Sequence, residues 1–92
     1  MPLTRRVIFK TAIEKQNRIQ ISKIIRWEYK LEHTQLLKVT VSVVGWVAVR
    51  EGFLAHMRKD GRITIPILIA ALLKQNEASL ERRAVEVMLE PM

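Results

Sequence analysis

The chain has 92 residues, of which 49% are apolar and 27% are charged, and its formal net charge is +7. A single domain of this size has enough apolar residues for a core, so this composition excludes a disordered chain. There is no cysteine, which excludes a disulfide framework and a thiolate metal site.

No apolar run reaches the ~18 residues of a membrane-spanning helix. The three apolar residues 7–9 near the N-terminus are followed by Lys10, and they are too few for the hydrophobic part of a signal peptide. We therefore expect a cytoplasmic protein with no membrane partner.

The first expected element is a strand over residues 7–14, which ends at the turn 15–17. Asn17 closes this turn, and asparagine is one of the residues that accept a positive φ. A second strand follows, in which apolar and polar residues alternate. The alternation predicts that Ile19 and Ile21 face inward and that Arg18 faces outward.

A short helix is expected next, with Ser22 as its N-cap. The residues Ile24, Ile25, Glu28 and Leu31 recur at the spacing of one helical face. A third strand alternates again. Its inward residues are Leu37, Val39, Val41 and Val43, and its outward residues are Lys38, Thr40 and Ser42.

The segment 44–52 is too apolar for a flexible linker. We interpret it as a continuation of the strand, bent at Gly45 and broken at Gly52.

The second half of the chain repeats the first. A shift of 44 residues brings Phe9 onto Phe53 and Ile13 onto Met57, and it aligns residues 17–21 with 61–65. After an insertion around residues 75–82 the shift widens to 48, and residues 37–41 then align with residues 85–89. One β–β–α–β unit is thus expected twice, over residues 7–44 and 51–91.

The second unit carries its own signals for each element. Its first strand is expected over residues 53–58, and the turn 59–61 contains Asp60-Gly61, a strong hairpin signal. Pro66 suits the first helical turn. The expected inward strand residues are Ile63 and Ile65, then Val85, Val87 and Leu89. In the helix between them, Leu68, Ile69, Leu72 and Leu73 recur at helical spacing.

A single unit would leave its strand edges exposed, whereas two units can pair edge to edge. We therefore predict a mainly β fold with two short helices, a six-stranded pseudo-twofold β-barrel formed by residues 1–92 as one domain. Ile19 and Ile63 should occupy equivalent buried sites. Because both halves are present in one chain, we expect a monomer, with weak homo-oligomerisation as the alternative.

The segment 60–66, Asp-Gly-Arg-Ile-Thr-Ile-Pro, with the apolar helix and Val-rich strand after it, resembles the SpoVT-AbrB DNA-binding domain. Residues 17–22 are a degraded version of the same motif. Two units in one chain resemble the single-chain cradle-loop barrels, including the RIFT type known from small archaeal proteins. The resemblance covers about 80 of the 92 residues.

The resemblance implies a DNA-binding transcription regulator that uses arginines on one barrel face. Arg18 and Arg62 match the motif arginine after the turn, and Arg26 matches a basic helix position whose counterpart is Ala70. Basic positions that the family often has on the first strand are here Thr11, Ala12, Ala55 and His56. The expected DNA face is therefore incomplete, above all in the second unit.

Charge is concentrated in the first unit. Residues 1–44 hold nine Lys/Arg and three Glu, whereas residues 45–92 hold seven Lys/Arg and six acids. The candidate nucleic-acid-binding residues are Arg5, Arg6, Lys10, Lys15, Arg18, Lys23, Arg26 and Arg62. They either contact phosphates, with duplex DNA as the expected partner, or form a solvated surface that keeps the protein soluble.

The aromatic residues Trp27, Tyr29 and Trp46 are expected to cover the barrel ends rather than to stack on bases. His33 and His56 lack further ligands at metal-binding spacing. No catalytic constellation or nucleotide loop appears, so we expect no enzymatic activity, cofactor, metal or small-molecule substrate. The alternative function is a protein-binding or assembly module without nucleic acid.

Overall fold

The computed structural model describes residues 5–45, 49–74 and 80–91. Its elements are β1 (Val7–Ala12), a 3₁₀ turn (Lys15–Asn17), β2 (Arg18–Gln20), α1 (Lys23–Glu28), β3 (Leu36–Val43), β4 (Arg50–His56), β5 (Arg62–Thr64), α2 (Ile67–Lys74) and β6 (Ala84–Pro91). The order strand, strand, helix, strand therefore occurs twice. None of the helices within these ranges has the length and apolar character needed to cross a membrane.

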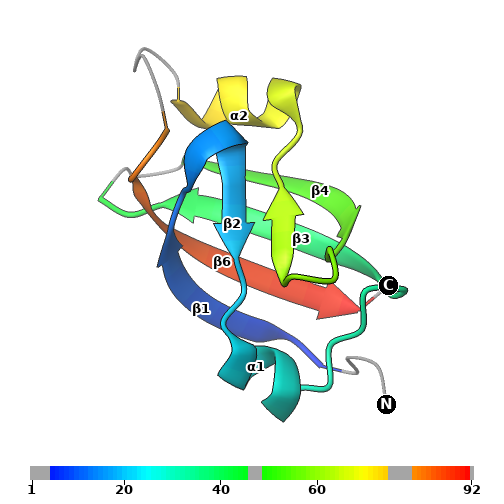
Figure 1. The fold of residues 1–92 in the computed structure, drawn as a ribbon. Coiled ribbons are helices and arrows are strands. Elements are labelled where there is room, and N and C mark those ends of the chain that lie inside the picture. Colours follow the sequence, from blue (N-terminus) through cyan, green and yellow to red (C-terminus); the bar gives the residue numbers. More distant parts are fainter. Residues whose placement is uncertain (1–4, 46–48, 75–79, 92) are drawn as a thin grey trace.

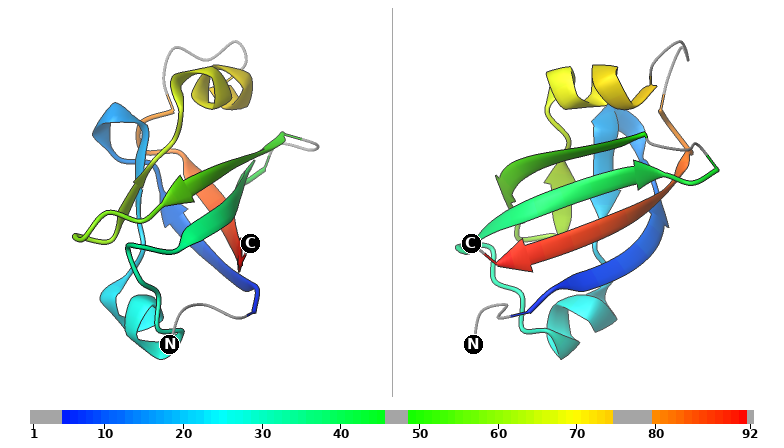
Figure 2. Two further views of the ribbon diagram at one scale, coloured as in Figure 1. Left: turned by 90° about the vertical axis from the view of Figure 1, so that its right-hand side faces the viewer. Right: turned by 180° about the vertical axis from the view of Figure 1, so that it is seen from behind.

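The strands form two antiparallel sheets. The larger has the order β1-β6-β3-β4, and β2 pairs with β5 in the smaller. The small sheet lies over one face of the large one, and α1 and α2 lie at opposite ends of the molecule (Figures 1 and 2). The mainly β fold with two helices is confirmed. The described strands, however, form two sheets and not one continuous, closed six-stranded sheet.

The pairing registers relate the two halves of the chain. At the centre of the small sheet Ile19 faces Ile63, and in the large sheet Thr40 faces Met88. The strand β1 pairs with β6, and β4 likewise pairs with β3. Corresponding backbone hydrogen bonds close the turn after β1 and the turn after β4, from Glu14 N to Arg18 O at 2.7 Å and from Arg58 N to Arg62 O at 2.8 Å.

The core lies between the two sheets, and the strand alternation predicted it well. The inward strand residues Ile19, Ile21, Leu37, Val39, Val41, Val43, Ile63, Ile65, Val85, Val87 and Leu89 are all buried, as are Ile13 and Met57. Leu80 is also fully buried, although its position in the insertion gave no periodic signal for it. Thr40 is buried where an outward residue was expected, since it lies on a central strand between Gly52 and Met88.

The helices differ from the prediction because only a narrow stripe of side chains on each helix packs against the core. Ile25 and Leu31 pack inward from the α1 segment, and Ala70 and Leu73 from α2. Helical spacing groups Ile24, Leu68 and Leu72 with these core residues, but the three are 73%, 79% and 55% exposed. Glu28 is exposed as well. A helix of about two turns that covers one end of a sheet has no second neighbour to bury its other face.

The segment between the halves corrects another expectation. Gly45 adopts φ +88° in the turn after β3, as the expected bend requires. Gly52 does not break a strand, because β4 runs through it from Arg50 and ends at His56. At Gly52 an added Cβ would meet only ordinary contacts with Val39 and Thr40, at 3.6 and 3.7 Å, so glycine is not required there by lack of space. Trp46 lies outside the described residues.

Candidate nucleic-acid interface

Local signals at both ends define α1. Ser22 Oγ accepts a hydrogen bond from Ile25 N at 3.2 Å, which confirms it as the N-cap. After the last turn, Lys30 N donates to Trp27 O and Leu31 N donates to Arg26 O, at 3.3 and 2.9 Å. This pair of bonds is a Schellman motif. Its left-handed position, which usually holds glycine, is occupied by Lys30 at φ +54°.

Cations and exposed apolar side chains gather on the outer side of this helix. We call the residues Lys23, Ile24, Arg26, Trp27 and Lys30 the α1 surface. With Leu31 and Glu32 they line a hollow of about 740 Å³, in which Glu32 is the one acid among the lining residues. The side chain of Trp27 is 83% exposed, so the prediction that it packs as a half-buried cover is wrong. Tyr29, by contrast, is partly buried against the core, as expected.

Arg26 reaches from the first unit to the turn of the second. Its guanidinium lies over buried Gly61, close enough that a Cβ added there would be 2.6 Å from Arg26 Cζ. Nε of Arg26 is buried without a hydrogen-bond partner. Arg26 also lines a second hollow of about 370 Å³, together with Leu31, Glu32, His33, Thr34, Met57 and Lys59. Arg26, Leu31 and Glu32 are thus shared by both hollows.

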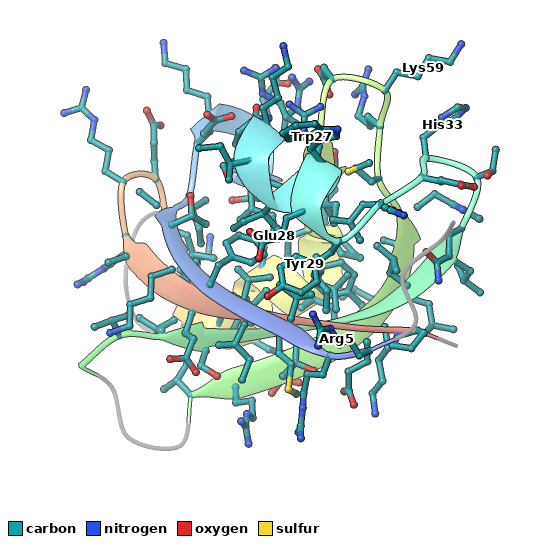
Figure 3. All side chains as sticks on the ribbon, turned by 90° about the horizontal axis from the view of Figure 1, so that it is seen from below. Arg5, Trp27, Glu28, Tyr29, His33 and Lys59 are labelled. Atoms are coloured by element: carbon teal, nitrogen blue, oxygen red, sulfur yellow. The ribbon has the colours of Figure 1, made fainter. Side chains whose placement is uncertain are left out.

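Figure 3 relates these residues to the rest of the molecule. Trp27 lies toward the same edge of the view as Lys59 and His33, whereas Tyr29 and Arg5 lie nearer β1. The cations of the second hollow thus come from both units, with Arg26 on α1 and Lys59 on the turn after β4.

Two other sequence-predicted cations, Lys15 and Arg18, lie together at the turn between β1 and β2. They line a separate hollow of about 850 Å³ with Arg62 and Arg82, but Glu14 and Glu81 line it as well. The guanidinium of Arg18 donates to Gln16 Oε1. Because two acids lie among the four cations of this hollow and Glu14 is paired with Arg62, it is less suited to a polyanion than the α1 surface is.

Arg62 is held by two carboxylates. Its Nε lies 2.9 Å from Glu14 Oε1, and one terminal nitrogen lies 3.0 Å from Asp60 Oδ2. The hydrogen bond to Glu14, then that to Asp60, raises the pKa of Arg62 above its ordinary value. A phosphate would have to displace these partners, so the geometry favours a structural role in which Arg62 links the turns of the two units.

The same cluster predicts a pH dependence. The Arg62 backbone N–H, followed by its side chain, lowers the pKa of Asp60 below the ordinary 3.8. A carboxyl group with a lowered folded pKa stabilises the fold above its unfolded pKa, and this stabilisation is lost as pH falls through the folded pKa.

We expect an NMR titration midpoint for the Asp60 carboxyl below 3.8, and an upward shift of this midpoint in the variant Arg62→Gln. Arg58→Gln is the matched control and should shift it less, since Arg58 contributes the weakest of the lowering effects. A midpoint unchanged by Arg62→Gln would contradict the assignment.

The remaining predicted cations do not join the α1 surface into one continuous face. Arg5 lies over the Tyr29 ring, with 5.4 Å from Cζ to the centroid. One terminal nitrogen of Arg6 lies 3.9 Å from Met88 Sδ. Lys10 is opposite Glu86 in the large sheet. The structure therefore brings Lys23 and Arg26 together, and separately Lys15 with Arg18. Lys30, one of the nine cations of the basic first unit, belongs to the α1 surface. Lys59, which lies in the less basic second unit, was not predicted as a binding residue.

Within ranges 5–45, 49–74 and 80–91, no group of three or more His, Cys, Asp or Glu residues could hold a metal ion. His33 lines the hollow beside Arg26, and His56 is exposed at the end of β4.

No protein-family model matches the chain, and no curated protein matches it either. Among solved structures, it is similar to the solution structure of PHS018 from Pyrococcus horikoshii. The two share 18% sequence identity, with a TM-score of 0.74 over 99% of this chain and 94% of the other. This likeness shows the fold alone.

Proposed function

We propose that this chain is a non-enzymatic DNA-binding protein that acts in transcription regulation and contacts phosphates through the basic surface of its first unit. The α1 surface carries the proposal. It combines three cations, Lys23, Arg26 and Lys30, with a largely exposed Trp27 around one hollow. Polyanion binding uses such clusters of Lys and Arg, because each neutralised phosphate releases counterions.

We further infer that the fold is a duplicated β–β–α–β unit arranged as a pseudo-twofold barrel. The pairing of Ile19 with Ile63, 44 residues apart, and of Thr40 with Met88, 48 residues apart, supports this inference. Both separations equal the shifts that align the two halves of the sequence. The equivalents of Lys23, Arg26 and Trp27 on α2 are then Ile67, Ala70 and Ala71, so only the first unit would carry the basic surface.

Charge reversal of exposed lysines tests this function. The double variant Lys23→Glu/Lys30→Glu should bind duplex DNA much more weakly. Its affinity should also depend less on salt, because the slope of log K against log salt concentration becomes shallower by roughly 0.9 for each phosphate contact that is lost. Lys38→Glu/Arg50→Glu is the matched control. It changes the net charge equally at exposed positions of the large sheet and should affect binding much less. Equal losses in both variants, or no binding of DNA by the wild type, would refute the proposal.

A protein-binding module without nucleic acid is the second candidate, and α2 favours it. Ile67, Leu68 and Leu72 are largely exposed on this helix, and no charged residue separates them. An apolar cluster of this kind is typical of a protein contact. Under this alternative, Leu68→Ser/Leu72→Ser would abolish partner capture, whereas Lys23→Glu/Lys30→Glu would not change it.

A further inference from the structure

We infer that the α1 surface takes unpaired nucleotides, with a base stacked on Trp27 and the flanking phosphates held by Lys23, Arg26 and Lys30. This inference rests on the proposed nucleic-acid function and specifies its ligand as single-stranded nucleic acid. The hollow has an apolar lining from Ile24, Trp27 and Leu31, with cations beside it. That composition matches a nucleotide, which has an apolar base face and a charged phosphate.

The exposure of Trp27 is the first reason to prefer a single strand. Trp27 is 83% exposed and its neighbour Ile24 is 73% exposed, so neither side chain contributes much to the core. A duplex hides the faces of its bases and presents only their edges and its phosphates. An aromatic ring with open faces next to cations is, in contrast, the arrangement that binds single strands, since every unpaired base has a face that can stack.

The backbone at Lys30 is an independent reason. Lys30 occupies the left-handed position of the Schellman motif at φ +54°, where a non-glycine residue is disfavoured and glycine is usual. Lys30 lines the same hollow as Trp27, so the residue in this disfavoured conformation adds a cation to the site. Strain of this kind is commonly retained at binding sites.

The hollow next to Arg26 provides a place for a neighbouring phosphate. Arg26 has a buried Nε without a hydrogen-bond partner, and it lines this hollow with Lys59, His33 and Thr34. Two cations and a hydroxyl group can donate to phosphate oxygens. Glu32 lines both hollows, so a strand would have to run along their cationic side.

Binding of the full chain to fluorescent oligo-dT, oligo-rU and a duplex of equal length tests the inference. We expect tighter binding of at least one single strand than of the duplex, and the dT and rU arms distinguish DNA from RNA. Trp27→Ala should weaken single-strand binding by about 5- to 150-fold, the effect of losing one stacked base. In a Trp46→Phe background, Trp27 is the only tryptophan, and its fluorescence should be quenched on binding.

Two variants separate a binding role from a structural one. Leu68→Ala removes an equally exposed apolar side chain from α2 and should not change affinity. Lys30→Gly should have a melting temperature no lower than the wild type, because glycine suits the left-handed position, and yet should bind a single strand more weakly. A matching loss in Leu68→Ala, or no loss in Trp27→Ala and Lys30→Gly, would overturn the inference.

The outcomes also distinguish this inference from the function on which it rests. Binding of duplex DNA that is independent of Trp27 would overturn the single-strand inference and leave the proposed DNA-binding function in place. Binding of neither duplex nor single strand would overturn both. Binding to phosphatidylserine vesicles that depends on Trp27, with no binding to oligonucleotides, would also overturn both proposals. It would show that the α1 surface binds a lipid membrane and not nucleic acid.

Discussion

Truncation of either Ile19 or Ile63 to alanine is expected to lower the free energy of unfolding by about 2–5 kcal/mol. Both side chains are fully buried, and they face each other directly at the centre of the small sheet. Each truncation would leave a cavity between the two sheets that the surrounding strands cannot fill without moving. Denaturant unfolding of the two single variants, monitored by circular dichroism, measures the loss.

The double variant Ile19→Ala/Ile63→Ala shows whether the two sites share one packing environment. Residues in direct contact are rarely additive, so its loss should differ from the sum of the single losses by about 0.5–3 kcal/mol. Leu68→Ala is the control, because the same kind of truncation at an exposed site should change stability by no more than about 0.5 kcal/mol. A loss below about 1 kcal/mol for either isoleucine would show that the small sheet does not close the core.

Strand periodicity predicted the core because each strand has one face on it. Every inward position of β2, β3, β5 and β6 is buried where the alternation places it. Ile19 and Ile63, which the 44-residue shift placed at equivalent sites, are both buried, and the structure adds that they pair across β2 and β5. The burial of Leu80 was not predicted, because a single buried residue in an insertion produces no periodic pattern in the sequence. Separation of the strands into two sheets could not be predicted either, since a pattern of inward residues does not say which strand edges form hydrogen bonds.

The helices were predicted less well for a related reason. Helical spacing shows which residues share a face, but it does not show whether another element covers that face. Ile24, Trp27 and Leu68 are therefore apolar and exposed, and the aromatic residue expected to cover the barrel end lies instead among the cations of the α1 surface. Motif matching had a similar limit. It selected Arg62, which two carboxylates hold, and gave no role to Lys59, which lines the hollow next to Arg26.

A second large effect is expected at Gly61, where the turn of the second unit lies under Arg26 of the proposed binding surface. Gly61 is buried at φ +87°, a conformation that costs a residue with a side chain about 1–2 kcal/mol. A Cβ at this position would also lie 2.6 Å from both Cζ and Nε of Arg26, so the guanidinium would have to leave its place. Gly61→Ala should therefore reduce stability and weaken nucleic-acid binding together.

Gly45 offers a closely matched control for this prediction. It has nearly the same backbone conformation, φ +88°, but a Cβ added there would meet nothing within 4 Å. Gly45→Ala should thus lose a similar free energy of unfolding, about 1–2 kcal/mol, without any change in affinity. If Gly61→Ala acts through Arg26, adding it to Arg26→Ala should weaken binding no further, because the displaced group is already gone. Equal affinities for Gly61→Ala and Gly45→Ala would show that the position of Arg26 over the turn has no part in binding.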